Sequence, residues 1–187
     1  SKTLSFEEYL KIRTSVLLTE IMYNDYQCWE LVKYLQESGI SAFDWISTTL
    51  HKLDEAPPGI KSVVESFIRD TKDELWESEE ELITFYSCEE NYQRLLRGEA
   101  GHNVVFTHKG IVISRHFEGW LDFISQICSD LVSRTVTGKS EITRVENEVR
   151  YLRKFLANKM HGVLQESWNT DDIIDETEYD ILPWLID

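Results

Sequence analysis

Apolar residues recur at intervals of three and four along the first fifty positions, which is the spacing of amphipathic α-helices. Ser5 and Glu8 stand in the S-x-x-E spacing of a capping box and predict a helix start. A second helix is expected to end at Gly39, and Ser41 is expected to cap a third. The apolar positions of these helices are Leu10, Val16, Leu17, Ile21, Met22, Trp29, Leu31, Val32, Tyr34, Leu35, Phe43, Trp45, Ile46 and Leu50.

Turn signals divide the middle of the chain. Residues 54–59, with the letters DEAPPG, form the strongest break, because two consecutive prolines remove two backbone donors. A fourth helix follows through Val63 and Phe67. The S-x-x-E spacing then recurs at Ser78 and at Ser87, which predicts two short helices separated by a turn.

Residues 103–114, NVVFTHKGIVIS, allow two structures. Their β-branched residues lie on both sides of a turn signal and could form a short β-hairpin. Alternatively, Val105, His108, Ile111 and Val112 lie near one face of a helix. We favour the helix, because a lone two-stranded hairpin is only marginally stable.

A long helix is expected over residues 140–164, and its inward positions are Ile142, Val145, Val149, Leu152, Phe155 and Leu156. The whole pattern predicts the all-α class, as an irregular multi-helix bundle with one short β-hairpin as the alternative near residues 103–114. Residues 1–165 are expected to form a single helical domain. Residues 166–187 are expected to form an acidic C-terminal tail that packs on the domain or on a partner.

The net charge narrows the choice of partners. Nineteen basic and 34 acidic residues give a formal charge of −15, and eight acidic residues but no basic one lie between Glu166 and Asp187. This charge repels the phosphates of nucleic acids and anionic lipid headgroups, whereas it attracts a basic protein surface. We therefore expect no nucleic acid and no membrane as partner.

The cysteines indicate a reducing compartment. Cys28, Cys88 and Cys128 are odd in number, widely spaced, and form no C-x-x-C pair. Cys128 falls on an apolar helical face and is expected to be a core thiol. No apolar run approaches the ~20 residues of a membrane span. We expect a cytoplasmic protein.

Gly138, Lys139 and Ser140 are the three letters that close a phosphate-binding loop. Such a loop also needs a glycine five positions before its second glycine and a buried strand ahead of it. Here Ser133 stands at the first glycine's position, and the preceding residues have helical spacing. We therefore interpret the letters as a helix boundary, in which Gly138 ends one helix and Ser140 caps the next.

Two phrases of the sequence carry a family resemblance. They are LSFEEYLKIRTSVLLTEIMYNDYQCWELVKYL at the start and DELWESEEELITFYSCEENYQRLLRGEAGHN after residue 72. Together they resemble the C-terminal accessory region of radical S-adenosylmethionine proteins that carry an upstream cobalamin-binding domain. The resemblance covers about the first 103 residues, and the remainder matches loosely.

The resemblance implies an appendage to an enzyme rather than the enzyme. The C-x-x-x-C-x-x-C loop that binds the iron–sulfur cluster in such enzymes and the D-x-H-x-x-G stretch that binds cobalamin are absent, so no catalytic or cofactor-binding residue can be assigned. The parent enzyme would hold a 4Fe-4S cluster and S-adenosylmethionine, and its use of cobalamin stays open. The chain begins at Ser1 rather than methionine, and we expect a longer polypeptide upstream.

The candidate contact residues fall into two groups. Gly98, Gly101, His102 and Asn103 could line a substrate or partner opening of the parent enzyme, or could serve as caps and turns. The tail offers apolar anchors among its acids, of which the main ones are Tyr179, Trp184 and Leu185. We expect no metal site, because His102, His108 and His116 share no helical face.

Three functions remain in view. The first is a non-catalytic accessory domain of a radical S-adenosylmethionine enzyme, which contacts the upstream catalytic domain of its own chain. The second is a free-standing acidic adaptor or inhibitor that binds a basic protein surface. The third, an independent small enzyme, lacks a recognisable grouping of residues: the carboxylates Glu79 to Glu81, Glu89 and Glu90 stand at expected helix starts, where exposed negative charge is favourable.

The tail gives a first testable expectation. If its apolar anchors pack on the domain, deleting residues 177–187 should lower the thermal midpoint, because apolar area worth ~25 cal/mol per Å² returns to water. If they pack on a partner, the deletion should leave the midpoint unchanged and weaken association. Calorimetry and a binding assay with the parent enzyme's catalytic domain separate the two outcomes, and a truncated chain that shows neither effect would contradict both.

Overall fold

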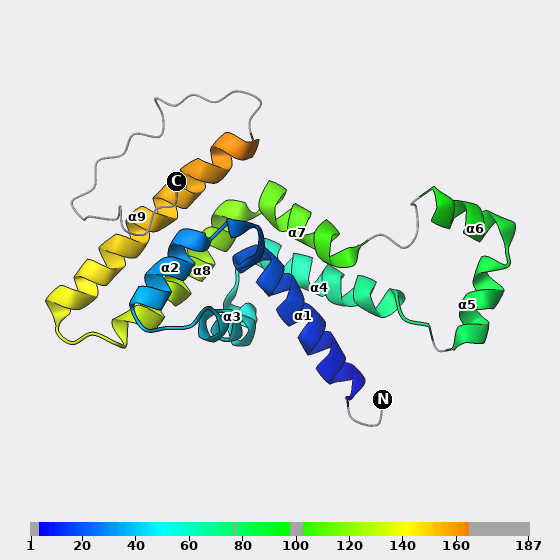
Figure 1. Cartoon of the computed structure of the whole chain (residues 1–187), viewed down its shortest axis with the longest axis horizontal. Coiled ribbons are helices and arrows are strands. Elements are labelled where there is room, and N and C mark those ends of the chain that lie inside the picture. Colours follow the sequence, from blue (N-terminus) through cyan, green and yellow to red (C-terminus); the bar gives the residue numbers. More distant parts are fainter. Residues whose placement is uncertain (1–3, 77, 98–102, 165–187) are drawn as a thin grey trace.

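The computed structural model describes residues 4–76, 78–97 and 103–164, and every regular element in these ranges is helical (Figure 1). The expected all-α class is confirmed. The helices in chain order are α1 (Phe6–Met22), α2 (Trp29–Glu37), α3 (Ala42–His51), α4 (Pro58–Asp73), α5 (Glu79–Tyr86), α6 (Glu89–Leu96), α7 (Val104–Arg115), α8 (Phe117–Ser133) and α9 (Lys139–Leu164), with short 3₁₀ helices at Asn24–Tyr26 and Leu53–Glu55.

Most of the expected helix starts are confirmed by their caps. Ser5 caps α1 in a complete capping box with Glu8, and the hydroxyl oxygens of Ser41 and Ser78 accept hydrogen bonds at the starts of α3 and α5. The expected cap at Ser87 is wrong. Ser87 ends α5 and its hydroxyl donates to the Ile83 carbonyl at 2.7 Å, so Cys88 takes the cap position of α6.

Residues 103–114 form the start and body of α7, and the β-hairpin alternative is wrong. The Asn103 side chain accepts from the backbone N–H groups of Val105 and Phe106, at 3.1 and 3.3 Å. The helix then buries a continuous face that includes Val104, Val105, His108 and Val112. Burial of this face outweighs the low helix propensity of its β-branched residues.

The core is shared by seven of the described helices. Antiparallel α8 and α9 form the closest pair, α2 packs on both, and α3 links α8 to α1 (Figure 1). The antiparallel helices α4 and α7 pack on each other and on α1. The largest fully buried side chains are Trp45, Trp120, Phe67, Leu17, Leu18, Ile21, Met22, Leu31, Leu35, Ile60, Leu121 and Ile124.

On α1, α3 and α9, three apolar residues expected on the inward face point outward. Val16 is 39% exposed, Phe43 is 76% exposed and Ile142 is 36% exposed. On α1 and α3, threonines take part in the buried face instead, because Thr14 and Thr49 donate their hydroxyls to carbonyls four residues earlier. A hydroxyl satisfied within its own helix can be buried at little cost.

Buried polar contacts hold α9 to α2. The Tyr34 hydroxyl donates to a Glu148 carboxylate oxygen at 2.8 Å. At the other end of α2, Glu30 is fully buried and accepts from the Lys159 Nζ at 2.7 Å. Glu30 therefore depends on α9 for the cation that compensates the burial of its charge, whereas Glu148 also lies 3.8 Å from the Arg144 guanidinium of its own helix.

Lys159→Met should destabilise the fold strongly. It leaves the buried Glu30 carboxylate without its cation, a loss of about 3 kcal/mol in the free energy of unfolding for a pair of this kind. The double variant Glu30→Leu/Lys159→Met should recover most of that loss, because both charges are removed. Urea unfolding of each variant measures this, with Lys154→Met as the matched change at an exposed lysine of the same helix. Equal midpoints for Lys159→Met and Lys154→Met would contradict the role of the pair.

Candidate functional site

The contact residues expected from the sequence fall mostly outside the described ranges. Gly98, Gly101, His102, Tyr179, Trp184 and Leu185 all lie there. Asn103 is described, and its side chain caps α7. Its role in the fold is therefore that of a helix cap.

Two of the three histidines considered as metal ligands are described: His108 lies within α7, and His116 is the residue that ends it. His108 is 1% exposed, its Nδ1 lies 2.8 Å from the Val104 carbonyl, and its Nε2 lies 2.9 Å from the Ser66 hydroxyl. Asp70 adds a carboxylate oxygen 3.4 Å from the same Nε2. His108 thus joins α7 to α4, and its burial keeps the imidazole away from solvent.

The contact between His108 and Ser66 resembles the pairing of a base with a nucleophile. Here, however, the Ser66 hydroxyl also lies 3.1 Å from the Val63 carbonyl of its own helix. The aromatic ring of Phe67 packs edge-on against the imidazole at 5.5 Å. The arrangement supports helix packing, and it presents no open face of His108 to a substrate.

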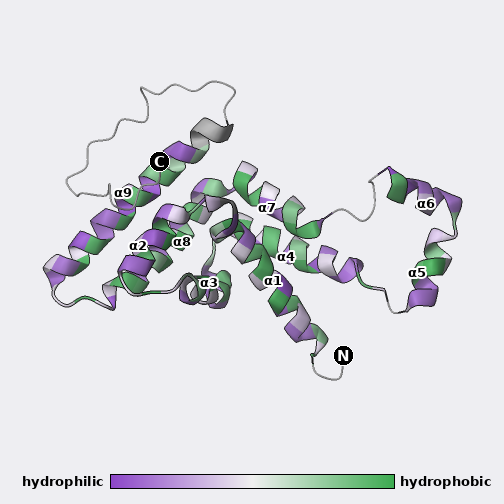
Figure 2. Cartoon of the chain, in the orientation of Figure 1, coloured by the Kyte–Doolittle hydropathy of each residue, from purple (hydrophilic) through white to green (hydrophobic). Residues whose placement is uncertain are grey.

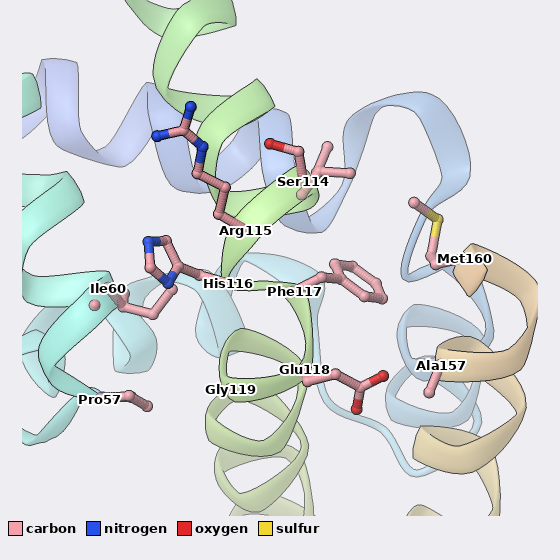
Figure 3. Close-up of a pocket in the computed structure, with 12 residues that line it drawn as sticks. Pro57, Ile60, Ser114, Arg115, His116, Phe117, Glu118, Gly119, Ala157 and Met160 are labelled. Carbon is pink, nitrogen blue, oxygen red and sulfur yellow. The ribbon is translucent and has the colours of Figure 1, made fainter. Parts of the chain in front are cut away.

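His116 lies in a surface pocket of about 340 Å³ where α4, α7, α8 and α9 meet (Figure 3). The apolar lining residues are Pro57, Ile60, Ile113, Phe117, Ala157 and Met160, and the polar ones include Ser114, Arg115, His116 and Glu118. Figure 3 shows the His116 ring turned toward Ile60 and the Phe117 ring turned toward Met160.

Gly59 lets α4 approach this pocket closely. A Cβ at residue 59 would come within 2.6 Å of the His116 Nδ1, so any larger residue would force the imidazole to move. Within the lining, Glu118 is paired with Arg153, and the Ser114 hydroxyl donates to the Gly110 carbonyl at 2.7 Å. The pocket therefore offers an imidazole at an apolar wall, which suits binding of a small group rather than nucleophilic chemistry.

A second candidate surface lies on the segment between α4 and α7. This segment contains α5 and α6, and we call residues 78–97 the acidic hairpin. In Figure 1 the hairpin stands apart from the body of the molecule. Neither of its helices has a buried residue. Glu79 to Glu81 and Glu89 and Glu90 are exposed in the first turns of α5 and α6, as the sequence predicts.

The residues that resemble a phosphate loop form a turn between two helices. Ser133 ends α8, and Gly138 adopts a left-handed φ of +93° directly before α9. The expected roles of Gly138 and Ser140 are both wrong: α8 ends at Ser133, five residues before Gly138, and α9 already begins at Lys139. A helix rather than a strand precedes the turn, so this segment lacks the context of a nucleotide site.

The cysteines lie in two different environments. Cys28 and Cys128 are fully buried, while Cys88 is exposed at the start of α6. Burial raises the pKa of the Cys28 thiol from 9.0 to about 12, and burial likewise raises the pKa of Cys128. Thiolate formation at either buried site is unfavourable, so neither is suited to nucleophilic chemistry.

Among the described residues, no three His, Cys, Asp or Glu side chains gather in an arrangement that could hold a metal ion. In the same part of the chain, no helix combines the length and the apolar character needed to cross a membrane. Comparisons with protein-family models, with curated proteins and with solved structures give no match.

Alkylation should distinguish the three thiols. In the native protein, iodoacetamide should modify Cys88 alone, and Cys28 and Cys128 should react after unfolding in urea. Intact-mass spectrometry counts the adducts, and Cys88→Ser should abolish the native adduct. A second native adduct at pH 8 would contradict the burial of these thiols.

The raised pKa of Cys28 also makes stability depend on pH, because the fold favours the neutral thiol. The contribution of Cys28 to the free energy of unfolding holds below pH 9 and falls as the pH rises from 9 toward 12.

Proposed function

We propose that this chain is a non-catalytic helical accessory domain of a radical S-adenosylmethionine iron–sulfur enzyme. In that enzyme it would cover the barrel or position the substrate or a partner, and it would work in the cytoplasm. The observation that carries the proposal is the acidic hairpin, which presents apolar side chains that the described body does not bury. Such a surface is typical of a site that contacts another protein.

The sequence resemblance supports the same proposal. Of the two phrases that resemble the accessory region, the first covers α1 and most of α2 and the second contains α5 and α6. The resemblance therefore includes two of the helices that share the core and the hairpin that projects from it. It does not include residues with an assigned catalytic role.

The cofactors of the proposed parent enzyme would lie outside this chain. The thiols of the present chain do not suit a 4Fe-4S cluster. Cys28 and Cys128 are buried with raised pKa values, and Cys88 is on the hairpin, away from both. The cluster, S-adenosylmethionine and any cobalamin would belong to upstream domains. The present chain would contribute a surface that contacts those domains.

The acidic charge favours a second candidate, a free-standing adaptor or inhibitor that binds a basic protein. The net charge of −15 would steer such a partner toward the chain. Both candidates use the hairpin as a contact surface. They differ in whether the contacted surface belongs to the same polypeptide.

The reading frame that encodes residue 1 tests the proposal directly. Its upstream part should encode a barrel-sized segment with a C-x-x-x-C-x-x-C loop. Reconstituted anaerobically with iron and sulfide, the present chain should bind no stoichiometric cluster and should cleave no S-adenosylmethionine, while the joined polypeptide should assemble the cluster. A start codon next to Ser1 would contradict the accessory domain and favour the adaptor, and a stable cluster absorbance in this chain would contradict its non-catalytic role.

A further inference from the structure

The acidic hairpin is placed so that it can reach away from the core. Helix α4 leads out of the body, α7 returns antiparallel to it, and the hairpin connects their outer ends (Figure 1). At its base, the Trp76 ring packs on the rings of Phe85 and Tyr86, with centroids 5.0 and 5.9 Å apart. This aromatic cluster joins the connecting segment to α5.

The hairpin carries apolar side chains that remain in contact with solvent. Ile83 is 57% exposed and Leu96 is 62% exposed, and Phe85, Tyr92 and Leu95 are each more than a third exposed. Figure 2 shows hydrophobic colouring on both α5 and α6, beside strongly hydrophilic turns. In each helix the acidic residues occupy the first turn, and the exposed apolar residues follow them along the helix.

Helices as short as α5 and α6 need a second surface that buries their apolar residues. Each has eight residues, and isolated helices shorter than about 12 residues are marginal in water. The body cannot supply the missing burial, because it buries no residue of either helix. Another surface must therefore bury these exposed apolar residues when both helices are stably formed.

The charge of the chain distinguishes the surfaces that could bury these residues, which are its own tail, a second copy and another protein. The acidic hairpin contains five acidic and two basic residues, and residues 73–77 directly before it add three acidic ones, which gives a net charge of −6 over residues 73–97. Residues 165–187 contain eight acidic residues and no basic one. Together they carry 14 of the 15 net negative charges. The chain's own tail would therefore be repelled by the hairpin, and a second copy would bring the same acidic hairpin.

We infer that the acidic hairpin docks in an apolar groove with a Lys- and Arg-rich rim on another protein. The exposed apolar residues of α5 and α6 fill the groove, as in helix-in-groove recognition, and the glutamates of the first turns meet the basic rim. Ile83 and Leu96 are the principal anchors. The inference deepens the proposed function, which identifies the groove with the upstream catalytic domain.

The test uses the full chain and a defined probe. The probe is a 14-residue amphipathic helix made of Leu and Lys, and the control peptide has Glu in place of Lys. Fluorescence anisotropy should show saturable binding of the Leu/Lys helix that weakens with salt, and no binding of the Leu/Glu helix. Ile83→Ser/Leu96→Ser should weaken binding at least about tenfold, because two anchors are lost.

A matched control separates docking from general charge attraction. Phe43→Ser changes an apolar residue of the body that is 76% exposed, more than either anchor, and it should leave the affinity unchanged. Circular dichroism should show that the body of every variant stays folded, since each altered residue is exposed. Equal affinities for wild type and Ile83→Ser/Leu96→Ser, or no binding of the Leu/Lys helix, would overturn the inference.

If a second copy or the chain's own tail buries the hairpin, the experiments give different results. A dimer by analytical ultracentrifugation that Ile83→Ser/Leu96→Ser dissolves would show that a second copy covers the hairpin and overturn the inference. Stronger peptide binding after deletion of residues 165–187 would show that the tail competes for the surface and overturn it likewise. A start codon next to Ser1 together with hairpin-dependent peptide binding would reject the accessory domain and leave the docking inference standing, so the two proposals fail separately.

Discussion

A short helix is stable in water only when it buries one apolar face, and this requirement organises the whole molecule. Seven of the described helices meet it together, around Trp45, Trp120 and Phe67. Because the face of each helix is completed by others, the seven depend on one another. The remaining two, α5 and α6, do not take part in this shared core.

The polar contacts inside the body follow from the same requirement. Buried groups such as Glu30, Glu148 and His108 each meet a partner from another helix. These contacts set which helices face each other, since a buried polar group without its partner is costly. The body is consequently specific in its packing, whereas the acidic hairpin is held mainly by its own aromatic cluster and its two connections.

The sequence predicts helices well where the signal is local. The capping box at Ser5 and the long periodic run of α9 are such signals. The sequence-based prediction of a helix cap at Ser87 fails, because α5 and α6 follow each other directly. Ser87 ends α5, and Cys88 caps α6. The prediction also fails at Phe43, because periodicity marks an apolar residue without showing which neighbour would cover it. The contact of Ser66 with His108 joins residues 42 positions apart and has no local signal.

We expect the body to unfold as one cooperative unit and the exposed apolar residues of the hairpin to be buried only by an external partner. Native-state hydrogen exchange measures this, residue by residue, in the isolated chain. Amides of α5 and α6 should exchange orders of magnitude faster than those of α8 and α9, and a docked partner should slow them. Equal protection of the hairpin and the body in the isolated, monomeric chain would contradict this expectation.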